Sequence, residues 1–207
     1  MNNQQTLPEL HHFPVMLEEV ISICSPIKGG VYIDCTFGGG SYSKKILNYP
    51  ETKVIAIDRD KFVLNTGKSL EKKYPKRFTF YQIKFSEIDQ ITKDTLVDAI
   101  IFDLGLSSIQ LKNLERGFSF NSKDKLDMSM GLSKISAEDV VNQLSEKKLK
   151  SIIRILGEEK DASRIAKNII KSFLIKKITK VDQLVKIIEN SKTKKFTYKI
   201  NPSTKTF

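Results

Sequence analysis

Val31-Tyr32-Ile33-Asp34-Cys35-Thr36-Phe37-Gly38-Gly39-Gly40-Ser41-Tyr42-Ser43 is the stretch that decides the fold of this chain. An apolar run ends in consecutive glycines and a helix-like segment follows, which predicts a strand, a tight turn and a helix start. Glycines at such a junction let the backbone adopt positive φ and approach a ligand closely, and the free amides of the helix start face that ligand. The stretch therefore predicts a turn that binds a nucleotide-like molecule.

A second apolar run, Lys53-Val54-Ile55-Ala56-Ile57-Asp58, ends in a carboxylate 20 residues after Gly38. In a βαβ unit that binds a dinucleotide or nucleoside, an acid at this distance binds the ribose hydroxyls. The glycine turn and Asp58 therefore indicate one pocket.

Two further apolar runs, Phe78–Ile83 and Val97–Asp103, predict a third and a fourth strand, with helical segments between the strands. The fourth is nearly all apolar, which is typical of the middle of a parallel sheet. Strands that alternate with helices predict an α/β fold with a doubly wound, Rossmann-like sheet, in which ligands bind at the carboxyl ends of the strands. Asp34, Asp58 and Asp103 fall near such ends. Each alone could be an exposed loop acid or a helix cap, but three on one rim favour a site.

The α/β alternation stops after Asp103. Leu104–Met130 is rich in Gly and Ser and has no clear period; a loop of this length in a compact domain is usually functional or disordered, and its apolar content favours a function. From Ala137 onward the pattern is helical, which predicts an inserted all-helical domain. We expect a sheet core at 1–110, a basic loop region and helical insertion at 111–200, and the start of a return to the core at 201–207.

Serine and threonine residues mark the expected helix starts, because their side chains satisfy free amides there. Ser136 is expected to cap Ala137–Leu144, and Ser145 to cap Glu146–Leu156. Glu158–Leu174 continues the helical pattern, and Thr179 with Asp182 resembles a capping box for a last helix to about Asn190. Near the N-terminus, His12–Ile21 is expected to begin a short amphipathic helix.

The positive charge of the chain is unevenly distributed. Residues 1–144 contain 18 basic and 18 acidic side chains, whereas residues 145–207 contain 17 basic and 6 acidic ones, so the whole net charge of +11 lies in the C-terminal third. A neutral half joined to a basic half suits a protein that holds a polyanion while chemistry proceeds elsewhere. A lysine-rich composition with a solvated helix face is the alternative.

Other classes of protein are disfavoured by composition. Two cysteines without a CxxC motif and two histidines give no zinc pattern and no disulfide framework, so we expect no metal site. No apolar run approaches the roughly 20 residues that span a bilayer, and no targeting segment is evident, so a cytoplasmic protein without membrane contact is expected. The sequence leaves the oligomeric state open and allows a homodimer.

The glycine turn alone does not choose a cofactor, because Gly38-Gly39-Gly40-Ser41 is not GxGxxG. A nicotinamide cofactor would need a third glycine and a second βαβ half. S-adenosylmethionine needs a glycine turn, an acid for the ribose and an apolar wall for adenine, and Gly38–Gly40, Asp58 and Phe85 fit that set. Asp103, or backbone between Leu104 and Ser107, could accept a hydrogen bond from an attacking amine. Ser107 could instead cap a helix.

Several ordered motifs together resemble those of one known family, and they extend from His12 to Phe207. They are His12-Phe13-Pro14-Val15-Met16-Leu17-Glu18-Glu19, Asp34-Cys35-Thr36-Phe37-Gly38-Gly39-Gly40, Ile57-Asp58-Arg59-Asp60, Phe102-Asp103-Leu104-Gly105-Leu106-Ser107-Ser108-Ile109-Gln110-Leu111, Arg116-Gly117-Phe118-Ser119-Phe120, Leu126-Asp127-Met128, Gly157-Glu158-Glu159 and Asn201-Pro202-Ser203-Thr204-Lys205-Thr206-Phe207. By these motifs the chain resembles the bacterial MraW/RsmH family.

The resemblance implies an S-adenosylmethionine-dependent methyltransferase that modifies the exocyclic N4 amine of a cytidine in small-subunit (16S) ribosomal RNA. It also implies a partner, the ribosomal RNA or the small subunit itself. In that family the chain continues past the last motif and supplies further strands, so a C-terminally truncated sheet is expected here. The residues that match the family's methyl-donor positions are Gly40, Ser41, Tyr42, Asp58, Phe85, Asp103 and Gln110.

Two alternatives remain open at this point. The first is a truncated, non-catalytic RNA-binding relic, and the second is a nicotinamide-dependent oxidoreductase.

For methyl transfer to RNA, the target base must leave its stack to reach the pocket, and Phe118 and Phe120 are candidates to stack on it. Both could equally anchor the loop in a core.

Overall fold

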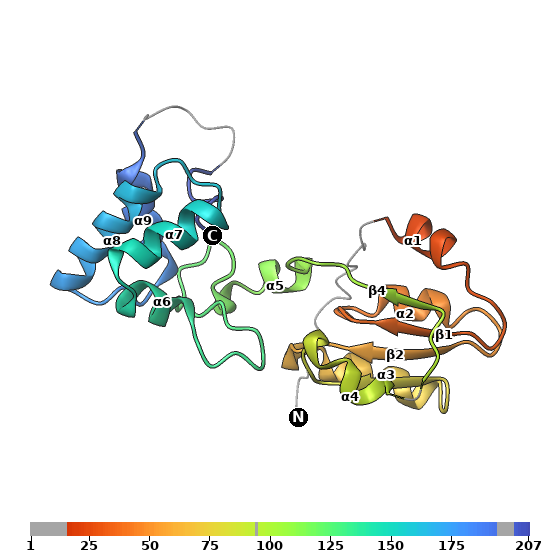
Figure 1. The fold of residues 1–207 in the computed structure, drawn as a ribbon. Coiled ribbons are helices and arrows are strands. Elements are labelled where there is room, and N and C mark those ends of the chain that lie inside the picture. Colours follow the sequence, from red (N-terminus) through yellow and green to blue (C-terminus); the bar gives the residue numbers. More distant parts are fainter. Residues whose placement is uncertain (1–15, 94, 194–200) are drawn as a thin grey trace, which may run out of the picture. The chain divides into compact units, whose positions relative to one another are not determined.

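The computed structural model describes residues 16–93, 95–193 and 201–207 (Figure 1). His11, His12 and the expected start of the first helix therefore lie outside the described residues. The chain divides into two compact units, which we describe separately. The sheet unit extends to Ile109 and includes Met130–Leu132, and the helical unit comprises Gln110–Ser129 and Ser133–Phe207.

The sheet unit contains a four-stranded parallel sheet in the order β3-β2-β1-β4, which confirms the predicted Rossmann-like α/β class. Its strands are β1 (Val31–Asp34), β2 (Lys53–Ile57), β3 (Phe78–Tyr81) and β4 (Ala99–Ile101). Its helices are α1 (Leu17–Cys24), α2 (Ser41–Ile46), η1 (Lys61–Val63), α3 (Leu64–Lys73), η2 (Phe85–Glu87) and α4 (Asp89–Thr92). β1 lies between β2 and β4, as Figure 1 shows.

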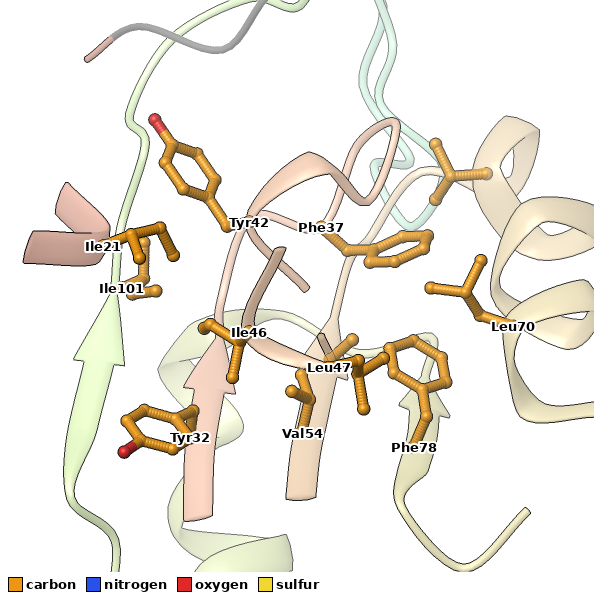
Figure 2. Close-up of a cluster of buried hydrophobic side chains, with 12 residues drawn as sticks. Ile21, Tyr32, Phe37, Tyr42, Ile46, Leu47, Val54, Leu70, Phe78 and Ile101 are labelled. Carbon is orange, nitrogen blue, oxygen red and sulfur yellow. The ribbon is translucent and has the colours of Figure 1, made fainter. Parts of the chain in front are cut away.

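One face of this sheet is covered by α1, α2 and α3. Side chains from these helices pack on alternate strand residues, because successive side chains of a strand point to opposite faces. Figure 2 shows this cluster, whose buried members include Ile21, Ile46, Leu70, Tyr32, Val54 and Phe78. On the opposite face, Ile33 and Ile57 pack against Ile88 and Ile91 of the η2–α4 region.

The fourth strand has the apolar sequence that is typical of a central strand. It pairs with β1 and is the last strand in the order of the described sheet. Ile100 is 45% exposed and Phe102, the first residue beyond the strand, is 48% exposed. Apolar content predicts a covered strand, and it does not specify how many neighbours the strand has.

The helical unit is built from α6 (Ala137–Gln143), α7 (Glu146–Ile155), α8 (Ala162–Ile175) and α9 (Val181–Ser191). Two short helices precede them, α5 (Ser108–Lys112) and η3 (Leu114–Arg116). The first two residues of α5 belong to the sheet unit. Its core consists of apolar side chains at helical spacing together with Leu126 from the long loop. The fully buried members are Leu126, Ala162, Ile165, Ala166, Val181 and Ile188. The loop thus contributes to the core.

The helix starts largely follow the predictions. Ser136 Oγ accepts from Asp139 N at 3.1 Å, and the Asp139 carboxylate accepts from Ser136 N in return; Ser145 Oγ accepts from Lys148 N. The capping box of the last helix was assigned wrongly, because α9 begins after Lys180 and Gln183 Oε1, rather than the Asp182 carboxylate, accepts the amides of Thr179 and Lys180, at 2.9 and 3.1 Å.

Residues 201–207, which the sequence assigns to the start of a return to the sheet core, pack within the helical unit. Phe207 contacts the helical core and lies edge-on to Phe120, with ring centroids 6.5 Å apart. Among the described residues, no helix combines the length and apolarity that crossing a membrane requires.

Candidate functional site

The glycine turn between β1 and α2 depends on left-handed backbone at two positions. Gly38 has φ +49° and Gly40 has φ +73°. A Cβ on Gly40 would lie 2.6 Å from the ring of Phe37. That ring is held by Phe78 and Phe80, with centroid distances of 5.7 and 5.2 Å. Gly40 is therefore required by both backbone conformation and packing.

The turn and Asp58 lie together, as the 20-residue spacing predicts. Gly38 N donates to Asp58 Oδ2 at 2.8 Å, and Asp60 N donates to Asp58 Oδ1 at 2.8 Å. Burial raises the pKa of Asp58, and these amide hydrogen bonds oppose the rise. A carboxylate has about four acceptor positions, so Asp58 can still accept from a ligand. Beside Gly38 the space is open, since its Cβ would meet only Thr36 O, at 3.8 Å.

The sequence indicated that Asp34 lies on an open rim with Asp58 and Asp103. In the structure it does not lie there. Its side chain is fully buried beneath the turn. Ser43 Oγ donates to Asp34 Oδ2 at 2.7 Å and Thr36 N donates to Oδ1 at 3.3 Å. Burial raises the pKa of Asp34 to about 6, against the lowering effect of these hydrogen bonds. Asp34 therefore supports the turn from below.

Asp103 lies beside the same segment. Its amide donates to Thr36 Oγ1 at 2.8 Å, and Tyr42 Oη donates to Asp103 Oδ2 at 3.4 Å. Burial and the neighbouring Asp103 charge raise the pKa of Tyr42 to about 12. The Tyr42 side chain is only 4% exposed, so its hydroxyl addresses Asp103 and its ring belongs to the core.

An aromatic pair stands at the ends of the strands. Phe85, at the start of η2, and Phe102 make an edge-to-face contact with ring centroids 5.5 Å apart. Both rings are partly exposed, Phe85 by 43% and Phe102 by 48%. The sequence predicted that Phe85 packs against adenine. It did not predict the same for Phe102, because the contact of Phe102 with Phe85 is formed only in the folded chain.

The remaining predicted site residues lie at the turn, before α5 and in the helical unit. Ser41 is the first residue of α2, next to the turn. Ser107 directly precedes α5, where a helix cap would lie. Gln110 is buried and belongs to the helical unit. Of the two stacking candidates, Phe118 is buried in the helical unit with the Arg116 guanidinium 4.9 Å from its ring centre, as a loop anchor would be.

The helical unit exposes basic side chains in rows. On α7, three basic residues at spacings of three and four share one face, and α8 repeats that spacing. The α7 row is Lys147, Lys150 and Arg154, and the α8 row is Arg164, Lys167 and Lys171; all six are exposed. Within the described chain, Arg164 pairs with Asp161. We call these two rows the basic stripes.

Comparison with known proteins gives one consistent result. A model of the MraW methylase family matches residues 9–207. Ribosomal RNA small subunit methyltransferase H of Neorickettsia sennetsu is 42% identical over 200 residues, which cover 96% of this chain and 67% of that protein. The protein of the same name from Orientia tsutsugamushi (strain Ikeda) is 41% identical over 200 residues, which cover 95% and 64%. The chain thus spans about two thirds of the length of these relatives, and it belongs to the MraW methylase family.

Proposed function

We propose that this protein transfers a methyl group from S-adenosylmethionine to the exocyclic N4 amine of a cytidine in small-subunit (16S) ribosomal RNA. The observation that carries the proposal is the contact between Gly38 and Asp58, with Asp103 held beside the same turn. Membership of a methylase family, whose relatives are named as ribosomal RNA methyltransferases, supports it. Family membership gives the nicotinamide alternative no support.

The residues of the sheet unit fit such a donor. Asp58 has acceptor positions left for ribose hydroxyls, and the open space at Gly38 leaves room for a ligand next to the turn. Phe85 and Phe102 offer exposed rings to adenine. Donor contacts at Gly40, Ser41, Tyr42 and Gln110 stay predictions from the resemblance; because the Tyr42 side chain is buried, its backbone would make any such contact.

The protein's task is mainly to position two reactants. Bound S-adenosylmethionine supplies an electrophilic methyl group, whose bond to sulfur breaks as the bond to the amine nitrogen forms. The cytosine amine is a weak nucleophile because its lone pair is delocalised into the ring. Asp103 would accept a hydrogen bond from this amine, direct the lone pair toward the methyl carbon and assist loss of the proton. Ser107 is a further catalytic candidate, and capping of α5 is its alternative role.

The basic stripes would hold ribosomal RNA phosphates. Phosphate contacts dominate the affinity of proteins for nucleic acids and make it depend on salt. The two rows place six cationic groups outward from α7 and α8, on the part of the chain that carries its net charge. A cytoplasmic location follows from a ribosomal substrate. The proposal uses no metal ion, and a homodimer stays a prediction.

Calorimetric titration of the protein with S-adenosylhomocysteine and with NAD tests the donor assignment. Binding of S-adenosylhomocysteine alone is expected, and binding of NAD alone would overturn the proposal. Binding of neither would favour the RNA-binding relic.

In single-turnover assays with small ribosomal subunits, Asp103→Ala should lower methyl transfer by about 100-fold or more, since a positioned acid–base group contributes on that scale.

The basic stripes are tested by salt titration of RNA binding. Replacing Lys147, Lys150 and Arg154 by glutamine should weaken RNA binding. The slope of log K against log salt should become shallower by about 0.9 for each duplex-like phosphate that the variant no longer neutralises. Lys28 and Lys53, exposed in the sheet unit, provide a control pair for the same change. An unchanged slope in the stripe variant would contradict the RNA assignment.

A further inference from the structure

Two side chains of the glycine segment hold Asp103 from different sides. The β1–β4 ladder continues past the strand end as Cys35 N donates to Ile101 O at 2.9 Å. Farther on, a side chain takes over, because Thr36 Oγ1 accepts the Asp103 amide at 2.8 Å. Tyr42 Oη then donates to the Asp103 carboxylate at 3.4 Å. Both the backbone and the carboxylate of Asp103 are therefore tied to one short segment.

We propose that Thr36 and Tyr42 are positioning residues. Together they fix the Asp103 carboxylate beside the glycine turn, where it accepts a hydrogen bond from the amine that attacks the methyl group. The inference rests on the role of Asp103 in the proposed function. Neither side chain needs to touch the donor or the base. Their effect is on the place and direction of one carboxylate.

The surroundings of Asp103 show why it needs such support. It lies just beyond β4 and precedes residues 104–107, which form no helix or strand before α5. Regular secondary structure therefore does not restrain the backbone directly on its C-terminal side. A displacement of about 1 Å at a reacting group can cost about 100-fold in rate. Two hydrogen bonds from the preceding segment limit that displacement.

Tyr42 is suited to this role because its ring cannot move freely. It is buried in the apolar cluster of the sheet unit, and Figure 2 shows its hydroxyl directed away from the other side chains of that cluster. Its raised pKa, about 12, keeps the hydroxyl protonated, so it remains a donor throughout the working pH range. The 3.4 Å distance is long for a bond to a carboxylate, and such contacts often shorten when substrate binds.

The experiment is a set of double-mutant cycles on the single-turnover rate of methyl transfer to small ribosomal subunits, with S-adenosylmethionine saturating. Thr36→Val and Tyr42→Phe are each made in the wild type and in Asp103→Asn. Each should lower the wild-type rate by about 10-fold, and neither should lower the Asp103→Asn rate further, because coupled residues are not additive. Affinity for S-adenosylhomocysteine should stay within about threefold, so that the loss is in rate.

Controls separate positioning from general damage to the fold. Thr36→Ser keeps the hydroxyl and should restore the rate. Tyr32→Phe removes a buried hydroxyl from the same apolar cluster, one that accepts from Ile27 N at 2.9 Å, and should leave the rate unchanged.

Three results would overturn the inference. If Asp103→Asn is slow but Thr36→Val and Tyr42→Phe keep the wild-type rate, this inference fails while the proposed role of Asp103 stands. The same holds if Thr36→Val and Tyr42→Phe lower the rate equally in the wild type and in Asp103→Asn. A wild-type rate for Asp103→Asn would instead remove the proposed role of Asp103, and with it this inference.

Discussion

The two units of this protein use their carboxylates in different ways. In the sheet unit, Asp34, Asp58 and Asp103 accept hydrogen bonds from amides and hydroxyls around one glycine turn, and Asp58 and Asp103 are partly exposed. In the helical unit, Asp139 closes a capping box and Glu159 forms a buried ion pair. Acids of the first unit build a candidate site, whereas acids of the second stabilise helix ends and leave its exposed surface basic.

The largest effect is expected at the ion pair of the helical unit. Glu159 and Lys192 join the start of the α8 region to the end of α9, with side chains only 5% and 9% exposed. Removing one partner leaves a buried charge without compensation, so Glu159→Gln should destabilise this unit by about 3–5 kcal/mol. Urea unfolding followed by far-ultraviolet circular dichroism measures the loss.

The matched control for this prediction is the double variant Glu159→Gln with Lys192→Met. It removes both charges, so it should be more stable than Glu159→Gln alone. Binding of S-adenosylhomocysteine by the sheet unit should change little in either variant. A double variant no more stable than Glu159→Gln, or a loss of S-adenosylhomocysteine binding that matches the loss of stability, would contradict the division of roles.

The glycine turn provides the next prediction, through two glycines with the same backbone conformation. Gly40 and Gly29 have φ +73° and +76°, but a Cβ on Gly40 meets the Phe37 ring at 2.6 Å, while one on Gly29 meets nothing within 4 Å. Gly29→Ala should therefore cost only backbone strain, about 1 kcal/mol. Gly40→Ala adds the clash and should cost about 3 kcal/mol.

Gly40→Ala should also reduce the affinity for S-adenosylhomocysteine by about 10-fold or more, because the turn must shift. Gly29→Ala should bind it normally. Calorimetry and urea unfolding of the two variants give both comparisons. Equal losses of affinity would show that the turn does not contact the donor.

Much of this comparison could be predicted from the sequence. Apolar runs that end at Asp34 and Asp58, and helical spacing after Ala137, have local physical causes, so the sheet and the helices after Ala137 were both predictable. The spacing from Gly38 to Asp58 correctly predicted that the two residues meet, because a βαβ unit brings successive strand ends together.

The features that could not be predicted depend on pairing between distant segments. Thr36 reaches Asp103 only because β4 lies next to β1, with Asp34 opposite Ile101. The burial of Asp34 likewise depends on where α2 places Ser43. A strand-end acid looks the same in sequence whether it faces a ligand or supports a turn.

The two units should also differ in the sign of their response to acid. The folded-state pKa of Asp34, about 6, lies above its unfolded value near 3.9, so the native state binds more protons between these pH values. Stability of the sheet unit should therefore fall by roughly 2–3 kcal/mol as pH rises from 4 to 7. Asp34→Asn should remove the larger part of this dependence, and Asp58, whose pKa burial also raises, should leave a smaller part of the same sign.

Asp139 should act in the opposite direction. Hydrogen bonds from the Ser136 hydroxyl and amide lower its pKa, so its contribution is present above the unfolded pKa and is lost as pH falls through the lower folded value. Five of the six tyrosines lie between Tyr32 and Tyr81, so tyrosine fluorescence reports mainly on the sheet unit and circular dichroism mainly on the helices. Urea unfolding at pH 4 and 7 should show fluorescence midpoints that rise on acidification, and that rise more in the wild type than in Asp34→Asn. A wild-type fluorescence midpoint that does not rise on acidification would mean that Asp34 is ionised in the folded protein, and that the sheet unit holds its acids as the helical unit does.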